Sequence, residues 1–290
     1  MTILIQIPDG RNIACAEYGH PAGYPVFFFH GIPGSRIFRP PDEVTTKMGV
    51  RLICTDRPGY GLSPFQPGRR IIDWPGDIAT IADKLGIERF AVAGHSGGGP
   101  YALACAFGLP DRISAAAVIS GIGPIDSASV LDGMDPTNKL GFTVGRWMPW
   151  PLWQFSNWIF FRRVARCPES LFPTPDLQTK LNLADKEVLS QPEILAHCRA
   201  SVQEAFRAGI EGHAWEGRLL TRPWGFALED IHSAVHVWHG SADQDVPIGM
   251  ARSLAGKIPA CKLNLFDNRG HLLIFPYWDK ILEMLIKREE

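Results

Sequence analysis

Short runs of consecutive apolar residues alternate with helical patterns along most of this 290-residue chain. Runs such as residues 26–29 and 90–93 show no polar face, which is typical of parallel strands covered by helices on both sides. The full set of expected strands comprises residues 3–7, 12–17, 26–29, 51–55, 90–93, 115–119, 234–238 and 262–266. This alternation predicts an α/β fold with a mostly parallel central sheet of about eight strands and helices on both faces.

The alternation stops between residues 122 and 228. Outside this segment, helices are expected at residues 75–85, 98–107, 248–255 and 276–287. The segment itself has helical patches at residues 180–189 and 192–208, no convincing buried strand, and six of the nine tryptophans. An insertion of this kind usually lies over the carboxyl ends of the strands, where ligands bind. We therefore predict a core of residues 1–121 and 229–290, with an inserted helical cap of residues 122–228.

The composition argues against several classes of protein. Lys and Arg total 29 against 30 Asp and Glu, so the clustered positive charge that nucleic-acid binding requires is not expected. None of the six cysteines forms a C-x-x-C pair, and we expect reduced, mostly buried thiols. The N-terminus lacks a signal-peptide pattern, and charged, polar and proline residues interrupt the most apolar stretch, residues 140–161. The sequence predicts a cytoplasmic protein with no membrane span and no nucleic-acid partner.

One pentapeptide indicates the chemistry. Residues 94–98 read Gly-His-Ser-Gly-Gly and match G-x-S-x-G, directly after one expected strand and directly before one expected helix. A sharp turn at this place strains the serine and projects its hydroxyl above the sheet, while the flanking glycines relieve the crowded backbone. The helix N-terminus also favours a developing negative charge. Ser96 is therefore the expected nucleophile.

A serine hydroxyl needs a base and an acid that orients the base. His271 follows the last expected strand, and Asp243 follows the strand before it, which gives the order Ser96, Asp243, His271. Each residue lies just beyond the carboxyl end of a strand, so the three can converge on one edge of the sheet. Other carboxylates compete for the role of the acid: Asp245, Asp267 and Asp126.

Backbone N–H groups should hold the oxyanion. The first expected donor is Gly97, and the second is Ile32, with Gly31 as the alternative, in the loop after the strand at 26–29. The substrate site is expected to include His95, which we expect to pack beside the nucleophile rather than catalyse, together with Trp147, Trp150 and Trp153. The aromatic residues between 147 and 161 have three interpretations: internal packing, an apolar substrate pocket, or an exposed surface for a homodimer.

These motifs resemble those of the α/β-hydrolase fold superfamily. The resemblance rests on His-Gly-Ile-Pro-Gly-Ser at 30–35, Asp-Arg-Pro-Gly-Tyr-Gly-Leu-Ser at 56–63, residues 94–98, His-Gly-Ser-Ala-Asp at 239–243 and Gly270-His271. It covers nearly the whole chain except the cap, and it implies a triad of Ser96, Asp243 and His271. Dehalogenase and epoxide hydrolase relatives have Asp as nucleophile, and proline iminopeptidases usually have Trp where this chain has Gly97, so these activities are disfavoured.

We therefore predict a serine hydrolase that cleaves a carboxylic ester of a small or medium apolar or aromatic substrate. Three alternatives use the same triad: hydrolysis of a carbon–carbon bond, a lactone or an amide, the last as in aminopeptidases. A fourth is a non-catalytic ligand-binding member of the fold. The sequence has no metal-binding cluster, phosphate loop or dinucleotide fingerprint. We expect no cofactor and no metal, with a small-molecule substrate and a homodimer as the possible partners.

Overall fold

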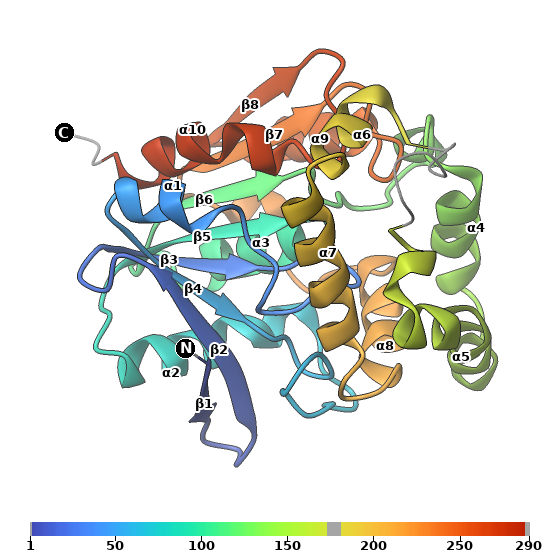
Figure 1. Cartoon of the computed structure of the whole chain (residues 1–290), viewed down its shortest axis with the longest axis horizontal. Helices are drawn as coiled ribbons and strands as arrows, with labels where there is room; N and C mark the ends of the chain where they lie inside the picture. Colours follow the sequence, from blue (N-terminus) through green and yellow to red (C-terminus); the bar gives the residue numbers. More distant parts are fainter. Residues whose placement is uncertain (1, 173–180, 288–290) are drawn as a thin grey trace.

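The computed structural model describes residues 2–172 and 181–287 and contains an eight-stranded sheet (Figure 1). The strands are β1 (Thr2–Gln6), β2 (Asn12–Gly19), β3 (Tyr24–Phe29), β4 (Val50–Thr55), β5 (Phe90–His95), β6 (Ile113–Ile119), β7 (Val235–Gly240) and β8 (Cys261–Phe266). Their order in the sheet is β1-β2-β4-β3-β5-β6-β7-β8. The hairpin β1–β2 and the pair β2–β4 are antiparallel, and all other neighbours are parallel. The predicted fold class is confirmed.

The described part of the chain contains helices on both faces of this sheet and in one long insertion. They are α1 (Asp42–Lys47), α2 (Trp74–Lys84), α3 (Gly99–Gly108), α4 (Pro136–Gly145), α5 (Trp150–Arg166), α6 (Leu183–Leu189), α7 (Pro192–Ala205), α8 (Glu211–Leu220), α9 (Ile248–Lys257) and α10 (Ile274–Ile286). The sequence pattern did not predict α1, α4, α5 and α8 as separate helices. Residue 180, the expected start of α6, lies outside the described residues, and the helix begins at Leu183.

The central strands are buried on both faces because their side chains alternate between two apolar clusters. In β3, Phe27 and Phe29 pack into the cluster that contains α2, α3 and α9. Val26 and Phe28 pack into the cluster that contains α10. Successive side chains of a strand point to opposite faces, so an uninterrupted apolar run fills both clusters at once. This two-sided core fixes the carboxyl ends of β5, β7 and β8. The candidate residues Ser96, Asp243 and His271 follow these three strand ends.

Along the chain, helices α4 to α8 follow β6 and precede β7. Figure 1 shows α4, α5, α7 and α8 together at one end of the sheet. The apolar stretch at residues 140–161 spans the end of α4 and most of α5, and the non-helical residues 146–149 separate the two helices. No helix within the described ranges is long and apolar enough to cross a membrane. We refer to residues 122–228 as the helical insertion.

Candidate active site

Ser96 lies at the turn between β5 and α3 with a positive φ of 53°. A non-glycine residue in this left-handed region is strained, and such strain clusters at functional sites. The turn requires the neighbouring glycines, because a Cβ atom on Gly98 would lie 2.2 Å from the carbonyl oxygen of Phe29. A Cβ atom on Gly94 would lie 2.2 Å from the carbonyl oxygen of Gly98. The spacing of the motif is therefore a packing requirement of the turn that presents Ser96.

His271 and Asp243 are hydrogen bonded: the Nδ1 atom of His271 lies 2.8 Å from an Oδ2 atom of Asp243. The other oxygen of Asp243 accepts the backbone N–H groups of Asp245 and Val246, each at 2.9 Å. Burial by itself raises the pKa of Asp243, but the charge and the hydrogen bond of His271, together with the backbone N–H of Val246, outweigh burial and lower it. The carboxylate is therefore ionised and fixed, and it can orient the imidazole.

The same carboxylate affects the basicity of His271. Burial lowers the pKa of the imidazole, but the negative charge of Asp243, followed by Asp245 and Asp185, outweighs it and raises the pKa to about 9. A hydrogen bond from Nδ1 to a carboxylate leaves Nε2 as the atom that can accept a proton. His271 is thus a strong base with a defined tautomer.

Two of the competing carboxylates have other partners. Asp126 pairs with Lys257 at 2.6 Å, and Asp245 accepts a hydrogen bond from Asn138 at 3.0 Å. Asp243, Asp245 and His271 place one ligand atom each within 4.8 Å of one another, a spacing that could hold a metal ion. We interpret Asp243 and His271 as an acid–base pair and not as metal ligands, because Asp243 is already bonded to His271 and to two backbone amides.

His95 connects Ser96, the next residue, to the backbone of His271. Its Nε2 atom lies 3.1 Å from the carbonyl oxygen of His271, and the two ring centroids are 4.9 Å apart. Its ring also stacks on Phe38 at 5.2 Å. Burial, and then the neighbouring His271, lower the pKa of His95 to about 3, so the ring is neutral and can donate to that carbonyl. These contacts make His95 a packing residue between the loops of Ser96 and His271.

The expected oxyanion donors lie on adjacent segments. A Cβ atom on Gly97 would lie 3.5 Å from the backbone nitrogen of Ile32, and one on Gly31 would lie 3.2 Å from the Cβ atom of Ser96. The loop that contains Ile32 is held by a buried arginine: Arg57 donates to the carbonyl oxygen of His30 at 2.6 Å and to that of Gly31 at 3.1 Å. Because these carbonyls are bonded, the loop backbone is fixed beside the turn of Ser96.

The insertion provides the counter-charge for that arginine. Glu216 on α8 forms an ion pair with the guanidinium of Arg57 and a second one with Arg69 at 2.7 Å, and all three side chains are buried. Burial raises the pKa of Glu216, but the two guanidiniums outweigh burial and lower it to about 2. Sequence reasoning missed Glu216, because a single acid carries no motif and no helix was expected at residues 211–220.

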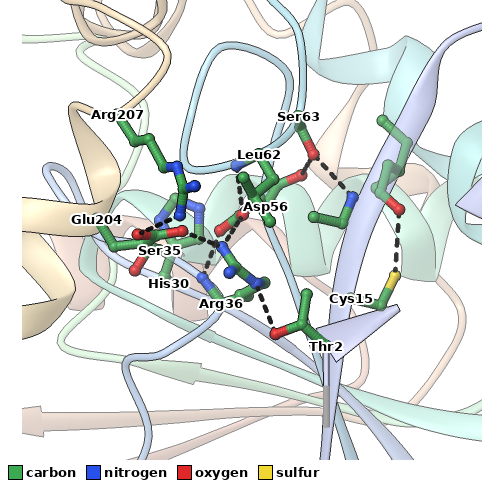
Figure 2. Close-up of polar contacts among 12 residues, drawn as sticks. Thr2, Cys15, His30, Ser35, Arg36, Asp56, Leu62, Ser63, Glu204 and Arg207 are labelled. Atoms are coloured by element: carbon green, nitrogen blue, oxygen red, sulfur yellow. Dashed lines mark hydrogen bonds and ion pairs between the residues drawn. The ribbon is translucent and has the colours of Figure 1, made fainter. Parts of the chain in front are cut away.

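A second ion pair joins the insertion to the loop after β3. Arg36 donates to Asp56 at 2.6 Å and to Glu204 on α7 at 2.7 Å (Figure 2). Asp56 also accepts the backbone N–H groups of Arg36 at 2.6 Å and of Leu62 at 3.0 Å. Asp56 therefore satisfies two turn amides. The insertion thus contacts the core through buried charges and not only through apolar packing.

The three tryptophans named as substrate-binding residues lie in the insertion. Trp147 is 78% exposed, and Trp150 packs edge-on against Trp215 with ring centroids 5.0 Å apart. Trp153 donates to the carbonyl oxygen of Ala214 at 2.7 Å. Other large apolar side chains of α5 are exposed: Leu152, Phe155, Trp158, Ile159 and Phe160. Substrate contact by the tryptophans stays a prediction, and Trp150 and Trp153 have packing partners within the insertion.

Comparison with known proteins identifies the family of this chain. A family model described as alpha/beta hydrolase fold matches residues 24–276. The chain belongs to the α/β-hydrolase family. Among solved structures, an α/β-hydrolase fold protein from Nakamurella multipartita is similar with a TM-score of 0.69 and 22% identity, covering 98% of this chain and 99% of that one. That similarity concerns the fold.

Two curated proteins resemble this α/β hydrolase in sequence. A bifunctional esterase/perhydrolase of Acinetobacter calcoaceticus is 30% identical over 287 residues, which cover 92% of this chain and 89% of that protein. A non-heme chloroperoxidase of Streptomyces lividans is 33% identical over 126 residues, which cover 40% of this chain and only 44% of that protein. The family match covers residues 24–276. The two relatives are named for different reactions, so the family does not fix the reaction of this chain.

Proposed function

We propose that this α/β hydrolase is a serine hydrolase that cleaves a carboxylic ester of a small or medium apolar or aromatic substrate. The observation that carries the proposal is the 2.8 Å hydrogen bond between His271 and Asp243 at the loop that contacts His95, next to the strained Ser96. A raised pKa of the base, a fixed carboxylate and a hydroxyl at a helix N-terminus together suit nucleophilic acyl transfer.

The proposed reaction has two steps. The Oγ atom of Ser96 attacks the ester carbonyl while its proton passes to Nε2 of His271, and the N–H groups of Gly97 and Ile32 hold the oxyanion. The tetrahedral intermediate collapses, the C–O bond to the alcohol breaks, and His271 returns the proton to the departing alkoxide. Water, deprotonated by His271, then attacks the acyl-enzyme, which releases the acid and restores Ser96.

A Ser96→Ala variant tests this proposal directly. Turnover of aryl esters of graded chain length should fall by at least about 10⁴-fold, because the acyl-enzyme can no longer form. A fluorophosphonate probe should label the wild-type chain and fail to label the variant. Ser170→Ala, at an exposed position on the insertion, is the control and should keep full activity. Ester turnover that survives in Ser96→Ala would contradict the proposal.

The substrate panel separates the alternatives that share the triad. It should contain lactones, aminoacyl amides and diketones beside the esters, since each of these bonds can follow the same acyl-transfer chemistry. A chain that binds aryl esters but neither turns them over nor reacts with the probe would be a non-catalytic receptor.

Hydrogen peroxide is a second candidate acceptor for the acyl group. The relative that covers 92% of this chain is named as a bifunctional esterase/perhydrolase. If peroxide replaces water in the second step, its oxygen attacks the acyl carbon and a peroxyacid leaves in place of the acid. Measuring peroxyacid alongside acid, with and without peroxide, decides between the two acceptors.

A further inference from the structure

A carboxylate of the insertion lies directly beneath the backbone of His271. Asp185, in the first turn of α6, accepts the backbone N–H of His271 at 2.9 Å through one oxygen and that of Leu272 at 2.7 Å through the other. Asp185 is only 2% exposed. A buried carboxylate that receives two adjacent backbone donors fixes the position of that backbone, because charge-assisted hydrogen bonds are short and strong.

The surroundings are arranged to admit this carboxylate. Gly270 precedes His271, and a Cβ atom there would lie 2.1 Å from an oxygen of Asp185 and 2.2 Å from the side-chain nitrogen of Asn182. Asn182 donates to Asp185 at 2.6 Å and to the carbonyl oxygen of Ala242 at 3.2 Å. Ala242 directly precedes Asp243, so Asn182 and Asp185 together contact the loops of both the base and its orienting acid.

We propose that Asp185 is a positioning residue of the hydrolase, which holds the His271 loop in register with Asp243 and so makes the helical insertion a cap that is part of the catalytic apparatus. This inference rests on the proposed serine hydrolase function. In the loop that follows β8, the backbone N–H groups of His271 and Leu272 both donate to the side chain of Asp185. The position of the imidazole then depends on the cap being docked, and a displacement of about 1 Å can cost roughly 10²-fold in rate.

The charge of Asp185 also bears on His271. The titratable groups that face the imidazole are Asp243 and Asp245 from the β7–α9 loop, His239 from the end of β7, His95 from the end of β5 and Asp185 from α6. The two histidines are neutral, since burial lowers the pKa of each. Asp185 is one of the carboxylates that raise the pKa of His271. Neutralising it should therefore lower that pKa, whereas a purely mechanical anchor would leave it unchanged.

The decisive variant is Asp185→Asn, which retains the shape but has one acceptor oxygen for two backbone donors. We expect kcat on an aryl ester to fall roughly 10- to 100-fold with KM changed less than about threefold, because ground-state contacts remain. The limb where kcat/KM rises with pH should move to lower pH, since the base needs to be neutral and its pKa falls. Glu193→Gln removes an exposed charge from the first turn of the next helix, α7, and should change neither quantity.

Asn182→Ala covers the case in which Asp185→Asn does not fold. It preserves the charge of Asp185 but removes the amide that holds it, so kcat should fall while the pH limb does not move to lower pH. Near-ultraviolet circular dichroism checks folding of every variant. Asp185→Asn or Asn182→Ala that folds and retains wild-type kcat and pH dependence would overturn the proposal.

The NMR titration of the His271 ring separates this inference from the proposed function. If Ser96→Ala and the wild-type chain behave alike on all substrates, the proposed function is wrong, but the ring titration still reads the effect of Asp185. A lower His271 pKa in Asp185→Asn supports the electrostatic contribution of Asp185. The positioning role is decided by kcat, and a folded Asp185→Asn variant with wild-type kcat rejects it.

Discussion

Individual glycines set the spacing around Ser96. Gly97 contributes its N–H to the proposed oxyanion site, and its missing side chain is as important as its amide. A Cβ atom at this position would lie 2.7 Å from the Cγ2 atom of Ile32, closer than real carbon atoms approach. In this chain, the close packing of Ile32 against residue 97 therefore depends on the absence of a side chain there, and a Cβ atom would require Ile32 to shift.

Gly97→Ala should lower kcat by about 10²-fold while the protein still folds. The added methyl group displaces Ile32 and separates the two donors, and losing one oxyanion donor costs 10²–10³-fold in kcat. Gly256→Ala is the matched control, because nothing lies within 4 Å of a Cβ atom there and alanine favours the helix. Ester kinetics measure the loss of kcat, and urea unfolding curves check that the variant folds. Wild-type kcat in Gly97→Ala would contradict the assignment of Gly97 and Ile32 as the two oxyanion donors.

At the scale of elements, α8 joins the insertion to the core through charge. Its residue Glu216 neutralises Arg57 and Arg69, and Arg57 in turn holds the loop of His30 and Gly31. Three buried charges in contact are stable only as a set, because each unpaired ion in the interior carries a large desolvation cost. The backbone beside Ser96 is thus stabilised by a residue more than a hundred positions away in the sequence.

Glu216→Gln should lower the free energy of unfolding by about 3–5 kcal/mol, because two guanidiniums remain buried without a counter-charge. Glu211→Gln on the exposed first turn of the same helix should change it by less than about 0.5 kcal/mol. Urea denaturation at pH 7 measures both. A Glu216→Gln protein as stable as the control would show that the charge of Glu216 contributes little to the stability of the fold.

For the whole molecule, the base that the proposed reaction needs also contributes to stability as a cation. Three carboxylates raise the pKa of His271 from 6.5 to about 9 against the opposing effect of burial. A raised pKa in the folded state means that this stabilisation is fully present below pH 6.5 and is lost as pH rises through about 9. The proposed hydrolysis needs the neutral base, so activity should rise over the interval in which this contribution declines.

The free energy of unfolding should therefore fall between pH 6.5 and pH 9 while kcat/KM rises. His271→Gln should be inactive and should lack that part of the decline, because glutamine does not titrate. Urea unfolding at pH 6.5, 7.5 and 9, paired with ester kinetics at the same values, measures both trends. Parallel stability curves for the wild-type and His271→Gln proteins would contradict the raised pKa.

Local sequence patterns were sufficient for the sheet and for the Ser96 turn. A strand buried on both faces needs an uninterrupted apolar run, and the turn at residues 94–98 needs glycines at fixed spacing, so both leave a signal in neighbouring residues. The order Asp243 then His271 was predicted from strand ends, and the two side chains are hydrogen bonded. Their catalytic roles, like that of Ser96, stay predictions until the variants are measured.

The sequence by itself determined which segments form strands, where the sharp turn lies and which loops follow the strand ends, because these properties depend on residues close together in the chain. Only the tertiary structure decided that Asp185 lies under His271 and that Glu216 pairs with Arg57. In the sequence, an isolated acid that belongs to no motif looks like a solvated residue. Its role arises from burial against a partner 86 or 159 positions away, and folding alone brings the two together.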